Sequence, residues 1–83
     1  MRPIVSNPEI YKKLQSIIAE VTGNDPEDIL YDMELSELSM SIMDRAQLLA
    51  HISGEFGINI SRYQFEEFET LEEIVQYLDD ELS

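Results

Sequence analysis

Near the end of this 83-residue chain, apolar residues recur three and four positions apart, and this pattern constrains the fold more than any other. Such spacing places side chains on one face of an α-helix, while the acidic and amide residues between them fall on the opposite face. The stripe therefore predicts a last helix that covers a hydrophobic core. Its members are Leu71, Ile74, Val75, Leu78 and Leu82.

The same spacing occurs near the start of the chain, between residues that begin and end helices. Asn7 can cap a helix and Pro8 suits its first position. Gly23 can end a helix with a left-handed backbone. We therefore expect a first helix between Asn7 and Gly23. Its apolar stripe consists of Ile10, Leu14, Ile17, Ile18 and Val21.

A long loop is expected to join this helix to a second one that runs from Ser41 to about Glu55. Asp25 and Pro26 predict a single helical turn in the loop, and spaced apolar residues would pin the rest over the bundle. Ser41 and Asp44 have the spacing of a capping box. The loop residues expected to be pinned are Ile29, Leu30, Met33, Leu35 and Leu38. Apolar faces of the second helix are supplied by Met43, Ala46, Leu49, Ala50 and Ile52, and Leu48 widens them, so we expect much of the helix to be buried.

A short helix is expected from Ser61 to near Phe68, with Phe65 and Phe68 turned inward. The alternating segment at 58–60 before it has no partner strand, so we expect an extended loop there. Three main helices and a short one predict an all-α fold, an antiparallel four-helix bundle with a long first loop. Residues 1–83 are expected to form one domain, with residues 1–6 as a loose lead-in.

Composition limits the function. Eighteen acids and five bases give a net charge of −13, which repels nucleic acid and favours partner proteins with basic surfaces. The chain has no Cys, its single histidine (His51) has no second ligand at metal spacing, and it has no glycine-rich phosphate loop. We therefore expect a non-enzymatic protein without a metal site. No apolar run is long enough for a signal peptide or a membrane span, which predicts a cytoplasmic protein without membrane insertion.

The order of these parts resembles the acyl carrier proteins and the related peptidyl carrier domains, over about residues 9–82. The matching segments are residues 14–20, Gly23 with 25–29, 35–38, 55–60 and 70–78. The resemblance implies a carrier in fatty-acid, polyketide or peptide-type biosynthesis. Members of the family carry a 4′-phosphopantetheine arm on the serine of a Gly-x-Asp-Ser-Leu motif, at the start of the second helix. The thiol of the arm holds the acyl or aminoacyl group as a thioester.

Set on this chain without gaps, the family motif places Ser39 at the glycine, Ser41 at the aspartate and Ile42 at the serine. Ile42 has no hydroxyl, so our leading hypothesis is a degenerate carrier that acts through protein contacts and has no cofactor. An exposed apolar patch at the helix entrance would then bind partners, because methionine suits adaptable contacts. The expected partner-binding residues are Met40, Ile42, Met43, Asp44 and Arg45.

The alternative hypothesis is a functional carrier that bears 4′-phosphopantetheine on Ser41. It requires a one-residue deletion before Ser41 and an insertion after it, which turns every later side chain by about 100° around the helix. A third possibility is an acidic structural or regulatory protein unrelated to carriers. Nine of the eighteen acids lie between Glu55 and Glu81. A partner that recognises charge is therefore expected to contact the third and fourth helices.

Overall fold

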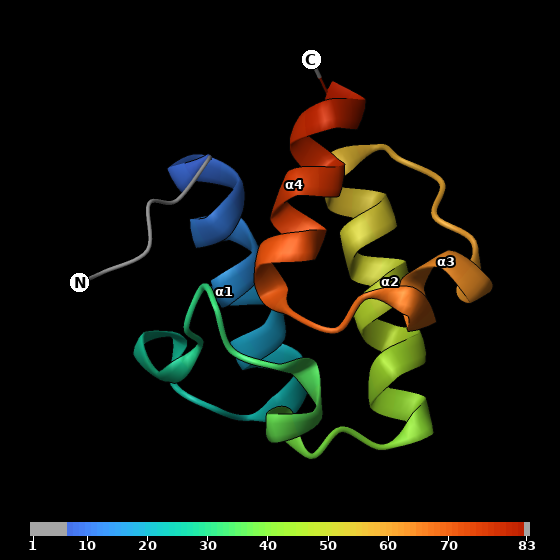
Figure 1. Ribbon diagram of the computed structural model, residues 1–83. Helices are drawn as coiled ribbons and strands as arrows, with labels where there is room; N and C mark the ends of the chain where they lie inside the picture. Colours follow the sequence, from blue (N-terminus) through green and yellow to red (C-terminus); the bar gives the residue numbers. More distant parts are fainter. Residues whose placement is uncertain (1–6, 83) are drawn as a thin grey trace.

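The computed structural model describes residues 7–82, and helices joined by loops make up this part of the chain (Figure 1). Within it the only strand-like pairing is an isolated antiparallel bridge between Glu34 and Thr70. The all-α prediction is confirmed, while the expected lead-in at residues 1–6 lies outside the described residues. The helices are α1 (Pro8–Thr22), α2 (Ile42–Phe56), α3 (Arg62–Glu67) and α4 (Leu71–Leu82), with short 3₁₀ helices η1 (Pro26–Asp28) and η2 (Leu35–Leu38) between α1 and α2.

The direction of the helices follows from the segments that join them. α1 runs opposite to both α2 and α4, so α2 and α4 run in the same direction (Figure 1). The extended residues 58–60 and the short α3 carry the chain from the end of α2 part of the way back along that helix, and α4 begins there (Figure 1). The antiparallel relation expected from the sequence therefore holds between α1 and its two long neighbours.

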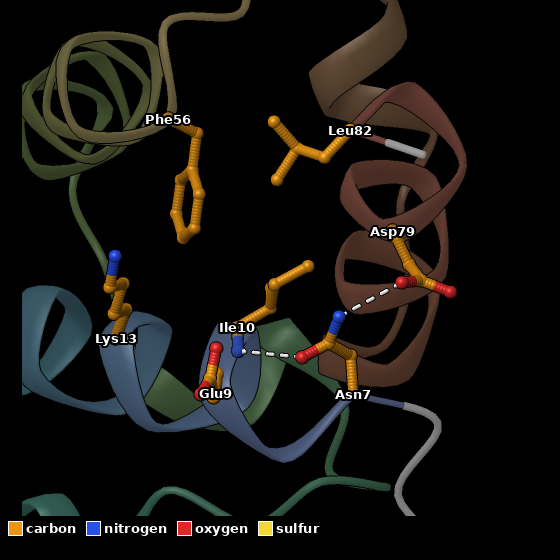
Figure 2. A pocket seen from close by; sticks show the side chains of 7 residues that line it. All are labelled: Asn7, Glu9, Ile10, Lys13, Phe56, Asp79 and Leu82. Carbon is orange, nitrogen blue, oxygen red and sulfur yellow. Dashed lines mark hydrogen bonds between the residues drawn. The ribbon is translucent and has the colours of Figure 1, made fainter.

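The predicted ends of α1 are confirmed. The Asn7 side-chain oxygen accepts a hydrogen bond from the backbone N–H of Ile10 (3.2 Å), which caps the helix. The Asn7 amide nitrogen donates to a carboxylate oxygen of Asp79 (2.9 Å), so this residue also joins the start of α1 to α4 (Figure 2). Gly23 ends the helix with φ 77°, in the left-handed region where a residue without Cβ is unstrained.

The core lies between one face of each long helix and the connecting loop. The α4 stripe is fully buried at four of its five predicted positions, and Leu82 is half exposed at the end of the helix. In α1, Ile17 and Val21 are only partly buried and pack at the edge. The side chains with no exposed surface are Leu14, Ile18, Ile29, Leu48, Ile52, Leu71, Ile74, Val75 and Leu78.

The loop between α1 and α2 is ordered as expected, but the prediction of which residues it buries was wrong at one position. Leu30 was expected to be pinned but is 53% exposed, and Tyr31 is buried in its place. In a non-helical stretch successive side chains point to opposite sides, so burial of Ile29 and Tyr31 turns Leu30 outward. The Tyr31 ring meets the Tyr11 ring edge-on at a centroid distance of 5.5 Å.

Polar contacts, which the sequence did not reveal, also hold this loop. The Tyr11 hydroxyl and the Gln15 side-chain amide both donate to the carbonyl of Ile29, at 2.7 and 2.9 Å. At its other end, the loop bonds to the segment before α4 through the Leu35 N–H and the Glu69 carbonyl (2.8 Å). The loop that leads into α2 is therefore fastened to α1 and to the segment before α4.

The prediction that much of α2 is buried is wrong. Its bounds agree with the expected helix within one or two residues, but only Leu48 and Ile52 are buried. Met43 is 72% exposed, and Ala46 and Ala50 are also exposed. In a bundle this small a 15-residue helix packs against the core along one face, so a second apolar face remains at the surface.

Side chains also cap the two later helices. The Ser61 hydroxyl accepts from the N–H of Gln64 (3.1 Å) at α3. The Thr70 hydroxyl accepts from the N–H of Glu73 (3.3 Å) at α4. The Glu73 carboxylate accepts a hydrogen bond from the N–H of Glu69 (3.2 Å), the residue before Thr70. Of the two phenylalanines expected to face inward, Phe65 is buried and Phe68 is half-buried.

Candidate functional site

A sharp turn brings the chain from η2 into α2. Ser39, the residue after η2, has φ 52° and ψ 43°, and it is the single non-glycine residue with positive φ in the described range 7–82. A residue with a Cβ pays on the order of 1–2 kcal/mol for this left-handed conformation. Ser39 therefore adopts a turn conformation that a glycine would adopt without strain, and the contacts of the surrounding loop hold it there.

Ser41 caps α2, as predicted. Its hydroxyl accepts from the N–H of Asp44 (3.1 Å), and the Asp44 carboxylate accepts from the N–H of Ser41 (3.2 Å). The N–H of Arg45 bonds to the Ser41 carbonyl (3.0 Å). The N–H groups of Ile42 and Met43 lie in the first turn, where no carbonyl of the helix can accept from them. Ser41 therefore presents an exposed hydroxyl beside the positive end of a 15-residue helix.

Two of the residues expected to bind partners are exposed at the start of α2. Ile42 is 75% exposed and Met43 is 72% exposed, so two adjacent apolar side chains stand at the surface where α2 begins. Met40 is half-buried and packs against the core. The structure thus brings Ile42 and Met43 together at the helix start and directs Met40 inward.

A groove between α2 and α3 lies next to this entrance and was not predicted. Its volume is about 430 Å³, and Arg45, one of the predicted partner-binding residues, lines it. The signal that could have revealed the groove is a second helical stripe on α2, separate from the buried one. The lining residues are Ile42, Arg45, Ala46, Leu49, Ala50, Ser53, Ile60, Arg62, Phe65 and Glu66.

The other candidate groups of the described residues lie at the surface or in the loop anchor. Across residues 7–82 no three side chains gather that could hold a metal ion, and His51 is exposed on α2. Burial raises the pKa of Tyr11, and the nearby Asp32 carboxylate raises it further, but this group belongs to the loop anchor. None of the helices in this range has the length and apolar character that a membrane span requires.

The comparison with known families gives the class of this protein. The family described as "Phosphopantetheine attachment site" matches residues 12–78, a range that includes α2, α3 and the Ser41 junction. The chain belongs to this family. The resemblance drawn from the sequence is thereby confirmed at the level of the family, and the match leaves open which residue, if any, carries the arm.

Individual relatives agree with the family match. The chain is 32% identical to an acyl carrier protein of Cyanidium caldarium over 81 residues, which cover 96% of this chain and 94% of the relative. It is 29% identical to an acyl carrier protein of Thermotoga maritima over 80 residues, with 95% and 99% covered. An acyl carrier protein of Streptococcus thermophilus is 30% identical over 71 residues, with 86% and 93% covered. Acyl carrier proteins are non-catalytic, in agreement with the expectation that this chain is not an enzyme.

Proposed function

We propose that this chain is an acyl or aminoacyl carrier that bears 4′-phosphopantetheine on Ser41. The observation that carries the proposal is the exposed Ser41 hydroxyl at the N-terminus of α2, in a chain that matches the attachment-site family. The comparisons favour this function over a carrier-like protein without an arm. The relatives are named acyl carrier proteins, and the match covers almost their whole length. A thioester on the arm would let a cytoplasmic carrier present the acyl group to partner enzymes.

The geometry around Ser41 suits a phosphodiester. Attack of the Ser41 oxygen on the β-phosphate of coenzyme A forms the new P–O bond, the hydroxyl proton is lost, and adenosine 3′,5′-bisphosphate leaves. The negative phosphodiester would then lie beside the N–H groups of Ile42 and Met43, at the positive end of the helix dipole. The Asp44 carboxylate would repel the negative phosphodiester, because it lies one helical turn away and accepts a hydrogen bond from the Ser41 N–H.

A second candidate function is a family member that works through protein contacts alone. Ile42 favours it, because the gap-free register places this residue at the family's serine position and it begins α2 with an exposed apolar side chain. In this register Ser41 takes the aspartate position and acts as the helix cap, which matches its hydrogen bonds to Asp44. Partners would then bind the entrance formed by Ile42 and Met43.

For either function we propose partner proteins with basic surfaces, because the charge of the chain is −13. The acids of α3, of α4 and of the segment between them offer the contact, since many of them are exposed and lie outside the groove. They include Glu67, Glu69, Glu73, Asp80 and Glu81. Binding of this kind should weaken steadily as salt is added, because salt screens exposed charges.

Incubation with coenzyme A and a broad-specificity phosphopantetheinyl transferase, followed by intact-protein mass spectrometry, tests the attachment. We expect a mass gain of one arm and the appearance of one thiol, which must belong to the arm because the chain has no Cys. Ser41→Ala should abolish both signals, whereas Ser39→Ala, the matched control at the neighbouring exposed serine, should keep them. Circular dichroism would verify that Ser41→Ala stays helical after losing a cap worth about 1 kcal/mol.

The double variant Ser41→Asp/Ile42→Ser separates the two candidates. It restores the family's aspartate and serine in the gap-free register. If this variant gains the arm while the wild-type chain does not, attachment at Ser41 is wrong and the contact function without an arm is supported. If the wild-type chain gains the arm and Ser41→Ala does not, the second candidate is rejected.

A further inference from the structure

α2 carries more apolar surface than the bundle buries. Its buried face contains Leu48 and Ile52, and a second stripe runs along a different side of the helix. Ile42, Ala46 and Leu49 follow each other at intervals of four and three, which places them in one row. Ile42 and Ala46 are exposed and Leu49 is half-buried, so the described part of the chain leaves this row largely uncovered.

The row forms one wall of the groove between α2 and α3. Ile60 and Phe65, each 4% exposed, also line it, so part of its surface belongs to the core. Ala46 and Ala50 are small and exposed, which allows another helix to approach α2 closely. The groove therefore offers a largely apolar channel beside α2, the form of site that takes the apolar face of an amphipathic helix.

The charge at the groove has the opposite sign to the rest of the chain. Arg45 and Arg62 line it together with one acid, Glu66, so the lining carries +2 − 1 = +1 while the whole chain carries −13. Within residues 7–82 neither arginine lies within 4.0 Å of a carboxylate, the distance at which Lys13 meets Glu55. Arg45 also borders a neighbouring hollow together with Glu34, Glu66 and Glu69, so Arg62 is the arginine that faces the groove with only Glu66 as an acid in the same lining. Exposed charges further away than about 8 Å are largely screened at physiological salt, so a ligand in the groove responds most to the groups of the lining itself.

We propose that the α2–α3 groove binds an acidic amphipathic helix of a partner protein. The apolar face of that helix would cover the row from Ile42 to Leu49. Its carboxylates would pair with Arg45 and Arg62, because the guanidinium fork matches a carboxylate in two parallel hydrogen bonds. This site does not require an arm on Ser41, so it holds for both candidate functions. It adds a second contact surface to the acidic face of α3 and α4.

A pair of synthetic peptides tests the charge of the occupant. Both are about 14 residues long, or four helical turns, with leucines at intervals of three and four. One has glutamates at the remaining positions, and the other has lysines. We expect the glutamate peptide to bind about tenfold more tightly in fluorescence polarisation, despite the charge of −13 on the chain. Tighter binding of the lysine peptide, or no binding of either, would overturn the proposal.

Charge-reversed variants locate the binding. Arg45→Glu/Arg62→Glu should weaken binding of the glutamate peptide by about tenfold, whereas Lys12→Glu/Lys13→Glu, an equal change of charge on α1, should have a much smaller effect. Equal losses in both variants would mean that only net charge matters, and the groove site would be rejected.

Binding to octanoate without binding to the glutamate peptide would identify a small-molecule site and also reject the proposal. Ser41→Ala should bind the peptide like the wild type, so failure of the arm and failure of the groove are distinguishable.

Discussion

α4 and α2 are both amphipathic helices of the same bundle, yet they use their apolar residues differently. α4 buries Leu71, Ile74, Val75 and Leu78 completely. α2 buries two residues and leaves Ile42 and Met43 about three-quarters exposed, although it is the longer helix. The fold thus buries nearly all the apolar side chains of α4, whereas α2 keeps exposed apolar side chains at its start and along the groove. Surplus apolar surface of this kind marks α2 as the helix available for binding.

The largest expected effect is the loss of a core side chain of α4. Leu78→Ala should lower the free energy of unfolding by about 2–5 kcal/mol, because it removes buried methyl groups and leaves a cavity. Urea unfolding followed by circular dichroism measures this change. Leu82→Ala, in the exposed last turn of the same helix, is the matched control and should stay within about 0.5 kcal/mol. A similar loss in both variants would contradict the role of α4 as the buried helix.

A smaller effect is expected where the loop is fastened to α1. Tyr11→Phe removes the hydrogen bond to the Ile29 carbonyl and should cost about 1 kcal/mol at neutral pH. Burial raises the pKa of Tyr11 in the folded chain, so the folded state holds the phenol proton more tightly. The resulting stability is fully present below the unfolded value of about 10 and is lost as pH rises through the raised folded value.

Unfolding free energies at pH 7 and at pH 11 measure this dependence. The wild-type chain should lose more stability than Tyr11→Phe between the two pH values. Tyr63→Phe, at an exposed tyrosine of α3, should lose as much as the wild type. If the free energy of unfolding falls equally in Tyr11→Phe and in the wild type, Tyr11 does not anchor the loop in the way its hydrogen bond indicates.

The smallest expected change in stability is at the start of α2. Ile42→Ala should alter the free energy of unfolding by no more than about 0.5 kcal/mol, because the side chain is exposed and alanine favours a helix. The same variant should weaken binding of the glutamate peptide several-fold, since Ile42 lines the groove. A loss of stability comparable to that of Leu78→Ala would remove the contrast between the two helices.

The parts of the fold that could be predicted from sequence are those set by neighbouring residues. Asn7, Gly23, Ser41 and Ser61 mark helix ends through bonds that span only a few residues, and the structure has those ends. The burial of α2 could not be predicted, because it depends on how α3 and the loop leave one face uncovered. The anchor between Tyr11 and Ile29, 18 residues apart, was hidden for the same reason.

The local structure of the Ser41 junction was predictable, whereas the contacts of its neighbours were not. The capping pair Ser41 and Asp44 and the exposed Ile42 follow from local spacing. The orientation of Met40 toward the core and the groove lined by Arg62 and Phe65 require distant segments to meet, so the sequence did not reveal them. The identity of the attachment residue depends on a shift of one position, which neither helical spacing nor the family match resolves.

The most direct measurement is therefore the intact mass of the wild-type chain after incubation with coenzyme A and a phosphopantetheinyl transferase, with peptide mapping of the product. We predict the gain of one phosphopantetheine arm on the peptide that contains Ser41, and no gain in Ser41→Ala. An unchanged wild-type mass would contradict attachment at Ser41, provided that a functional acyl carrier protein in the same reaction is fully modified.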